Sequence, residues 1–234
     1  MADDLLVIIP TRGRPQAIPE IMAAWDKTGA TAHVLFAVDD DDPQLAGYEA
    51  HAEALKGDGR VQFVFGKRER LVGTLNRQAV SAASAYRFLG FMGDDHRPRT
   101  AAWDARIREC LSGGPGIVYG NDLLQGELMP TAVAMTSDIV ATLGYMAPPQ
   151  FVHLCVDLVW KDWGVGIRRI TYLPDMVIEH LHPAAGKAQL DEGYEDANSA
   201  ERVTADATAY YAYRDDGALT ADLEKLRALV EEAA

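Results

Sequence analysis

The chain is poor in cysteine and has no long apolar run. Cys110 and Cys155 are its only cysteines among 234 residues, too few and too widely spaced for a disulfide framework or a cysteine metal site. No apolar segment approaches the roughly 18 residues that span a bilayer. Residues 1–10 contain no basic stretch ahead of their apolar run, so we interpret residues 5–9 as a strand rather than as a signal peptide. These absences predict a protein of the cytoplasm without a membrane span.

Positive charge is also in short supply. The chain has 22 Lys and Arg against 35 Asp and Glu, a net charge of −13, which disfavours nucleic acid and anionic membranes at long range. The basic residues nevertheless form two groups along the sequence, which are either solvated surface or local anion sites. The groups are Lys67, Arg68, Arg70 and Arg77, and then Arg97, Arg99, Arg106 and Arg108.

Two common phosphate-binding motifs are missing. The chain contains neither GxxxxGK followed by Ser or Thr nor GxGxxG. This argues against a P-loop ATPase and against a dinucleotide enzyme.

What the sequence does contain is a regular alternation of strands and helices. Apolar runs typical of strands buried on both faces cover residues 5–9, 33–38, 61–65 and 87–92. Helical patterns lie between and after them, at about 15–27, 43–55, 71–85 and 100–111. Such spacing predicts an α/β fold with a Rossmann-like, mostly parallel sheet and helices on both faces.

The second half of the chain is less regular. We expect strands at 117–119 and 131–135, a helix at 151–163, and extended segments at 167–173 and 176–180. Leu219, Leu223, Leu226 and Leu229 recur at helical spacing, which predicts a C-terminal packing helix.

Three polar segments follow predicted strands. They are Pro10–Arg14, Asp39–Asp42 and Gly93–His96. In open α/β sheets, ligands bind beyond the carboxyl ends of the strands, so these segments are the expected site. Arg12 and Arg14 are suited to gripping phosphates, and Asp39 to accepting hydrogen bonds from a base or a ribose.

Asp94 and Asp95 are the sharper signal. Adjacent carboxylates repel each other, and a cation or a ligand hydroxyl relieves that repulsion. Mg²⁺ or Mn²⁺ suits such a site, because these ions take few carboxylates and share their other positions with phosphate oxygens. The alternative is a helix-capping turn before Thr100.

The chain resembles the GT-A fold glycosyltransferases of the family 2 type over roughly residues 5–180. Three segments carry the resemblance, at Val7–Pro15, Leu75–Ala79 and Phe91–Pro98. The resemblance implies that the nucleotide is contacted by Pro10, Thr11, Arg12, Arg14 and Asp39, with Arg70 and Asn76 nearby, that Asp94 touches the ribose, and that Asp95 holds the metal.

The acidic motif departs from the Asp-x-Asp pattern of that family. It reads Asp94-Asp95-His96, so either His96 is a ligand or Asp95 holds the metal chiefly, and we favour Asp95. Family members often add a late His ligand, and His180 and His182 are available. Residues i and i+2 of a strand share a face, so both can point into the site, with His180 preferred. Imidazole favours manganese over magnesium, while a structural role for the histidines is the alternative.

The resemblance also places a base near the start of the helix after the acceptor loop, where Asp157 lies. Its apolar neighbours would raise its pKa. The alternative is an ordinary helix acid paired with Lys161, four residues further on. Trp160 and Trp163 are expected in the core rather than stacked on a sugar.

Together these features predict a metal-dependent, inverting glycosyltransferase that moves a sugar from a UDP-sugar to an acceptor hydroxyl of a glycan, a small molecule or a modified nucleic acid. Residues 1–182 would form the catalytic domain, with a nucleotide-binding half at 1–98 and an acceptor half at 99–182. Residues 183–234 would add a lid-like loop, including Asp191–Tyr194, and C-terminal packing helices. One alternative is a non-catalytic module that binds a nucleotide sugar. A second is a nucleotidyltransferase, although Thr11–Pro15 is a poor match to the Gly-rich loop of that class. A third is a transferase that acts on DNA bases, which the net charge disfavours.

Overall fold

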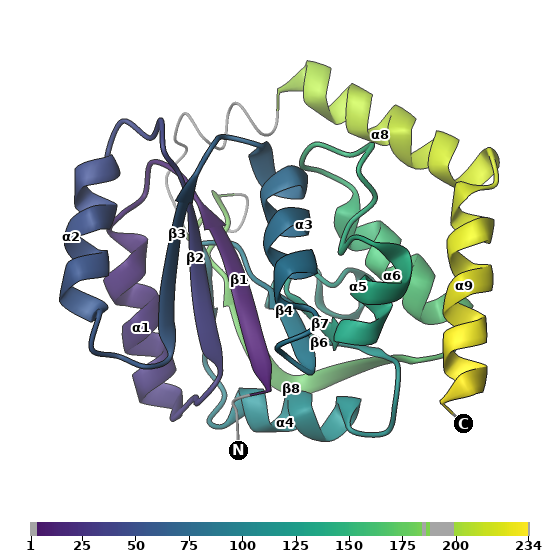
Figure 1. Ribbon diagram of the computed structural model, residues 1–234, viewed down its shortest axis with the longest axis horizontal. Helices are drawn as coiled ribbons and strands as arrows, with labels where there is room; N and C mark the ends of the chain where they lie inside the picture. Colours follow the sequence, from purple (N-terminus) through teal and green to yellow (C-terminus); the bar gives the residue numbers. More distant parts are fainter. Residues whose placement is uncertain (1–3, 184–185, 188–198, 234) are drawn as a thin grey trace.

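The computed structural model describes residues 4–183, 186–187 and 199–233, and its centre is an eight-stranded sheet (Figure 1). The strand order is β3-β2-β1-β4-β7-β6-β8-β5. The strands are β1 Leu5–Thr11, β2 His33–Asp39, β3 Val61–Gly66, β4 Phe88–Phe91, β5 His96–Pro98, β6 Ile117–Asn121, β7 Val133–Thr136 and β8 Ile170–His180.

The sheet is mostly parallel, as predicted. Strands β3, β2, β1 and β4 run parallel to one another, and β8 runs parallel to β6. Strand β7 is antiparallel to both β4 and β6, and β5 is antiparallel to β8. Because β1 lies between β2 and β4, the chain order reverses at β1, and the carboxyl ends of β1 and β4 form the crevice where ligands bind in such sheets.

Helices cover both faces of the sheet, which confirms the predicted fold class. Alternate residues of β1 serve opposite faces, as the two-residue period of a strand requires. Leu5, Val7 and Ile9 pack in one core with α1, α2 and α4, and Leu6 and Ile8 in a second core with the remaining helices. The helices are α1 Ala17–Thr28, α2 Leu45–Leu55, α3 Arg70–Ala82, α4 Trp103–Leu111, α5 Ser137–Leu143, α6 Val156–Gly166, α8 Ala200–Asp215 and α9 Ala218–Glu232, with a 3-10 turn η1 at Gly126–Leu128.

The structure differs from the sequence-based expectation in three elements near the site. The helix expected at 151–163 begins only at Val156, because Cys155 has a left-handed backbone with φ of 66°. The two extended segments expected at 167–173 and 176–180 are one strand, β8. The short strand β5 was not predicted, and it pairs His96 directly with His180 of β8.

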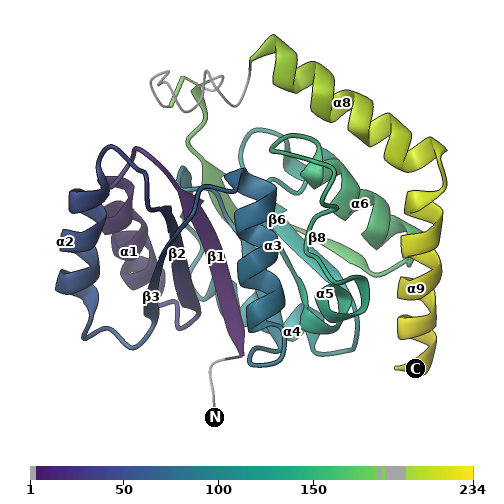
Figure 2. The same ribbon diagram turned by 45° about the horizontal axis from the view of Figure 1, so that its top comes forward.

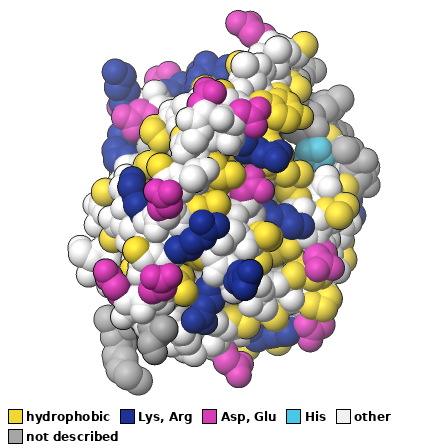
Figure 3. Space-filling model, turned by 90° about the vertical axis from the view of Figure 1, so that its right-hand side faces the viewer, with side chains coloured by type: hydrophobic (Ala, Val, Ile, Leu, Met, Phe, Trp, Pro, Cys, Tyr) yellow, Lys and Arg dark blue, Asp and Glu magenta, His cyan; other side chains and the backbone are white. Residues whose placement is uncertain are grey.

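The C-terminal helices close one side of the molecule, and α2 and α9 lie at its opposite edges (Figure 2). Helix α9 packs against α5 and α6, with Leu226 fully buried, as the leucine spacing predicts. The face that these helices form carries basic and acidic side chains interspersed with apolar ones (Figure 3). Among the described residues, none of the helices combines the length and the apolar character that crossing a bilayer requires. Asp191–Tyr194, expected to form part of a lid, lie outside the described residues.

A buried hydrogen-bond network holds α9 in place. Asp222 accepts hydrogen bonds from the hydroxyls of Tyr145 (2.5 Å) and Tyr213 (2.6 Å), and Tyr213 accepts one from Trp163 (2.8 Å). Asp222→Ala should therefore lower the free energy of unfolding by about 3 kcal/mol, because it leaves buried hydroxyls without their acceptor. Urea unfolding measures the loss. Glu224→Ala, on the exposed side of the same helix, should change stability little.

Candidate active site

A cavity of about 490 Å³ lies at the carboxyl ends of the parallel strands. Its volume falls within the range of small-molecule sites, roughly 300–1,000 Å³. Both halves of the chain contribute to its wall. Of the residues that the sequence singles out, it is lined by Pro10, Thr11, Arg12, Arg14, Asp39, Arg70, Asp94, Asp95, His96, Asp157, His180 and His182.

The ends of β1 and β4 are locked together at the base of the cavity. The hydroxyl of Thr11 donates to Asp94 Oδ2 (2.7 Å), and Arg14 Nη1 donates to Asp94 Oδ1 (2.9 Å). Burial raises the pKa of Asp94, and the charge of Arg14 opposes that rise. Asp94 is thus held by the segment that follows β1, and it does not cap a helix, since α4 begins only after Ala102.

Arginines gather around the end of β2. Arg12 Nη1 lies 3.1 Å from Asp39 Oδ2, and Arg68 Nε lies 3.8 Å from the same oxygen. Arg14, Arg70 and Arg202 also line the cavity. Burial raises the pKa of Asp39, while Arg12 counteracts it. An acidic chain thus brings several arginines together at one place, where Arg12 and Arg14 are also paired with carboxylates.

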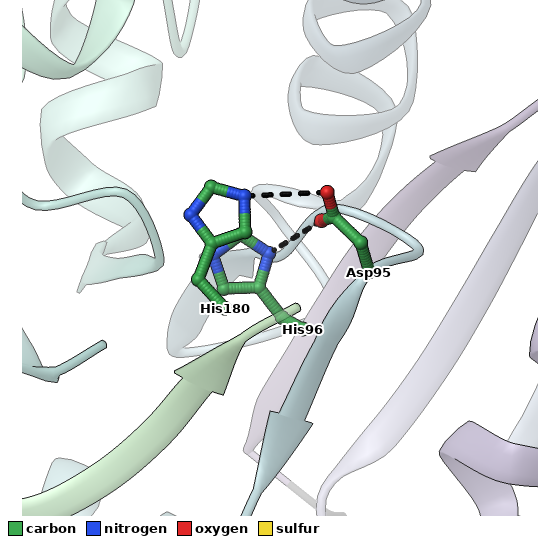
Figure 4. Close-up of side chains that lie close together, drawn as sticks. All are labelled: Asp95, His96 and His180. Carbon is green, nitrogen blue, oxygen red and sulfur yellow. Dashed lines mark hydrogen bonds and ion pairs between the residues drawn. The ribbon is translucent and has the colours of Figure 1, made fainter. Parts of the chain in front are cut away.

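Asp95, His96 and His180 form a compact cluster at the cavity wall (Figure 4). Asp95 Oδ1 lies 3.1 Å from His96 Nδ1, and Asp95 Oδ2 lies 3.2 Å from His180 Nε2. The two imidazoles stack with their centroids 4.2 Å apart, because β5 and β8 pair these residues. Within the part of the chain that the structure describes, these three residues place one ligand atom each within 4.8 Å of the others.

The cluster fits a divalent cation held chiefly by Asp95 and His180. Two ligand atoms bound at about 2.1 Å and at right angles lie about 3 Å apart, close to the observed 3.2 Å. His96 Nδ1 already accepts the backbone N–H of Gly93 (3.1 Å), so His180 Nε2 is the better placed imidazole ligand. A Cβ at position 93 would come within 2.6 Å of Asp95 Oδ1, so a side chain there would displace the Asp95 carboxylate.

Electrostatics in the cluster favour a positive charge. Burial would raise the pKa of Asp95, but its contacts with His180 and His96 hold that pKa well below its ordinary value. Burial lowers the pKa of His180, yet Asp122 and Asp95 outweigh it and raise the pKa to about 9. An ion at Nε2 would take the place of that proton.

His182 lies beside this cluster rather than in it. Its ring centroid is 4.9 Å from that of His180 in an edge-on arrangement, and it is half-buried in the cavity wall.

Asp157 lies in the first turn of α6 and faces the cavity. Burial raises its pKa, and its carboxylate accepts the N–H of Leu158 (3.0 Å). The alternative pairing with Lys161 is wrong, because Lys161 donates to the carbonyls of Glu127 (2.7 Å) and Leu128 (2.8 Å). The charge of His180 opposes this rise, and a buried carboxyl with a raised pKa is suited to accepting a proton.

The two tryptophans of α6 are core residues, as expected. Both are fully buried, although Trp160 also borders the cavity. Trp160 Nε1 donates to the Met146 carbonyl (2.7 Å), and Trp163 Nε1 donates to Tyr213 (2.8 Å).

The structure does not bring Asn76 to the cavity wall. Its amide oxygen accepts the N–H groups of Met146 and Ala147, and its NH₂ donates to the Ala147 carbonyl (2.7 Å). The side chain therefore ties α3 to the segment after α5, a contact between residues about 70 positions apart that local sequence does not reveal.

Several residues at the site were missed by the sequence analysis. Arg68 was noted only as one of a basic group, and Asp122, Thr131 and the loop 152–155 were not selected at all. Asp122 follows β6 directly after Asn121. The rule that drew attention to polar residues after three other strands would have found it.

Comparison with solved structures, unlike comparison of sequences, finds proteins with a similar fold. No protein-family model matches the chain, and no curated protein matches it in sequence. Residues 1–349 of TarS from S. aureus match with a TM-score of 0.59 and 13% identity over 92% of this chain and 74% of that one. The same protein in complex with UDP-GlcNAc matches with a TM-score of 0.59 and 12% identity, over 91% and 73%.

A second solved structure gives the same result. The mannosyltransferase PcManGT from Pyrobaculum calidifontis, in complex with GDP-Man and Mn²⁺, matches with a TM-score of 0.61 and 13% identity over 98% of this chain and 74% of that one. The chain therefore has the GT-A glycosyltransferase fold, and the resemblance seen in the sequence is confirmed.

Proposed function

We propose that this chain is a metal-dependent glycosyltransferase that transfers a sugar from a UDP-sugar to an acceptor hydroxyl. The observation that carries the proposal is the position of the Asp95–His180 pair in the wall of the same cavity as the arginines near Asp39. The fold supports it, because the similar structures contain UDP-GlcNAc in one case and GDP-Man with Mn²⁺ in another.

The nucleotide-binding half would be residues 1–98 and the acceptor half 99–182, with residues 183–234 appended. In this arrangement Arg12, Arg14 and Arg70 bind the phosphates, and Pro10, Thr11 and Asp39 form the nucleoside pocket. Asp94, which Thr11 and Arg14 hold in place, accepts a hydrogen bond from the ribose. Charged hydrogen bonds of this kind are about twice as strong as neutral ones.

Asp95 and His180 would hold Mn²⁺ or Mg²⁺, and His182 would assist from the edge of the site. When bound, the ion supplies positive charge for the diphosphate that leaves. The arginines supply further charge in the same place, and because they are already held in the cavity wall they need little reorganisation as the reaction proceeds.

Asp157 would act as the base of an inverting reaction. It takes the proton of the acceptor hydroxyl while that oxygen attacks the anomeric carbon and the bond to the diphosphate breaks. Its raised pKa favours this role, since a stronger base removes the proton more readily.

Ligand binding gives the first test. UDP at about 100 times its dissociation constant stabilises the folded protein by about 2.7 kcal/mol, which should raise Tm by about 5–10 °C, and more with Mn²⁺ present. Release of UDP from a UDP-sugar would then establish turnover. Release of pyrophosphate from a nucleoside triphosphate would indicate a nucleotidyltransferase, and UDP binding without turnover a binding module. No stabilisation by UDP or Mn²⁺ would contradict the proposal.

A further inference from the structure

A second carboxylate lies on the far side of His180 from Asp95. Asp122 is almost fully buried, and its Oδ2 lies 3.9 Å from His180 Nδ1. A backbone hydrogen bond also links the two residues: the N–H of His180 donates to the Asp122 carbonyl (3.0 Å). The imidazole of His180 therefore lies between two carboxylates, one facing each ring nitrogen.

The Asp122 carboxylate is held firmly in this position. Its Oδ1 accepts the backbone N–H groups of Leu124 (2.9 Å), Gln125 (2.7 Å) and Gly126 (2.8 Å). Its Oδ2 accepts the hydroxyl of Thr131 (2.8 Å) and keeps a lone pair for another donor. A carboxylate bound at both oxygens has little freedom to turn away from the ring.

His180 Nδ1 is the donor that fits this lone pair. It is buried and makes no hydrogen bond, which is rare for a buried polar atom in a folded protein. A small rotation of the ring would shorten the 3.9 Å separation to a hydrogen bond. A proton kept on Nδ1 leaves the lone pair of the neutral ring on Nε2, the nitrogen that faces Asp95.

We infer that Asp122 is a positioning residue, which keeps the proton of His180 on Nδ1 and thereby presents Nε2 to the divalent cation beside Asp95. This inference rests on the proposed function, since it concerns the same metal site. Asp122 itself does not touch the ion or the substrate. Metal-binding histidines commonly donate their second N–H to a carboxylate, and loss of that partner costs about 10-fold to 100-fold in metal affinity.

Asp122→Asn tests this role with little change in shape. The Asn oxygen can still accept the three backbone N–H groups, but its NH₂ replaces Oδ2 and donates toward Nδ1. The neutral ring then carries its proton on Nε2, where it blocks the ion. We expect Mn²⁺ affinity, measured by calorimetry with UDP present, to fall about 10-fold or more. Far-UV circular dichroism of the metal-free variant checks that it is folded.

Glu127→Gln is the matched control. It removes one negative charge from the same loop, and Glu127 is exposed. Its Mn²⁺ affinity should stay within about 2-fold of wild type, as expected for an exposed charge. Equal Mn²⁺ affinity in wild type and Asp122→Asn would overturn the inference while leaving the proposed function intact. Absence of Mn²⁺ binding in the wild type would overturn both.

A measurement on the wild type covers the case in which Asp122→Asn does not fold. In the protein loaded with Mg²⁺ and UDP, ¹⁵N chemical shifts of the His180 ring should show a proton on Nδ1 and a ligated Nε2. A ring ligated through Nδ1, or protonated on Nε2, would overturn the inference.

Discussion

Asp95→Ala should abolish Mn²⁺ binding and lower UDP-sugar turnover by about 1,000-fold or more. The variant removes the carboxylate that lies within 3.2 Å of both imidazoles, and neither histidine supplies the negative charge that a divalent cation needs. The ion contributes several kcal/mol of transition-state stabilisation in reactions of this class, and each 1.36 kcal/mol corresponds to a factor of ten in rate. Calorimetry with Mn²⁺ and an assay of UDP release measure the two effects.

Asp40→Ala is the control for this variant. Asp40 carries the same charge as Asp95, lies at the same edge of the sheet directly after β2, and is exposed to solvent. It should leave Mn²⁺ affinity and turnover within about 2-fold of wild type, as expected for an exposed charge. Unchanged Mn²⁺ affinity in Asp95→Ala would show that the cluster is structural, and the metal would have to be held elsewhere.

Asp157→Asn should lower turnover by about 100-fold to 10,000-fold, the contribution typical of a general base. Its affinity for UDP and Mn²⁺ should change much less than turnover, because Asp157 is not among the residues proposed to bind the nucleotide or the ion. The wild-type rate should rise with pH as Asp157 loses its proton, and this rise should be missing from the variant. A variant that keeps the wild-type rate would remove Asp157 from the mechanism.

The same substitution should stabilise the fold at neutral pH. Burial raises the pKa of Asp157, so ionising this carboxyl costs more free energy in the folded state than in the unfolded state. Above the folded-state pKa the charge therefore reduces stability, and Asn removes that cost. The advantage of the variant should shrink as pH falls and vanish below about pH 3, where the carboxyl is protonated in both states. Thermal unfolding across pH measures it, with Asp40→Asn as the control.

Much of the fold follows from local patterns in the chain. The apolar runs of β1 and β2 are easy to recognise because both faces of these strands are buried. The alternation of such runs with helical patterns indicated a parallel sheet. The segments after β1, β2 and β4 were correctly placed at one edge, since parallel strands end on the same side. The helix boundary at Val156 was not predictable in this way, because nothing in the residue type of Cys155 signals a left-handed backbone.

The candidate site, like the fold, was predicted only in part from the sequence. The adjacent carboxylates Asp94 and Asp95 were visible in the sequence, but their separate tasks were not. Asp94 turns toward Thr11 and Arg14, and Asp95 toward the two imidazoles. Asn76 was placed near the nucleotide by resemblance, whereas its amide joins α3 to residues 146–147.

Residue order alone was enough to establish the α/β fold, the edge of the sheet at which the polar segments meet and the acidic motif at that edge, because each depends on contacts between neighbours in the chain or on the common direction of parallel strands. The partners of that motif depend on long-range pairing. Strand β5 meets β8 across about 80 residues and brings His180 to Asp95, and the pairing of β6 with β8 places Asp122 on the other side of that ring. Hydrophobic periodicity indicates which residues of a strand share a face, but it does not indicate which distant strands become neighbours in the sheet.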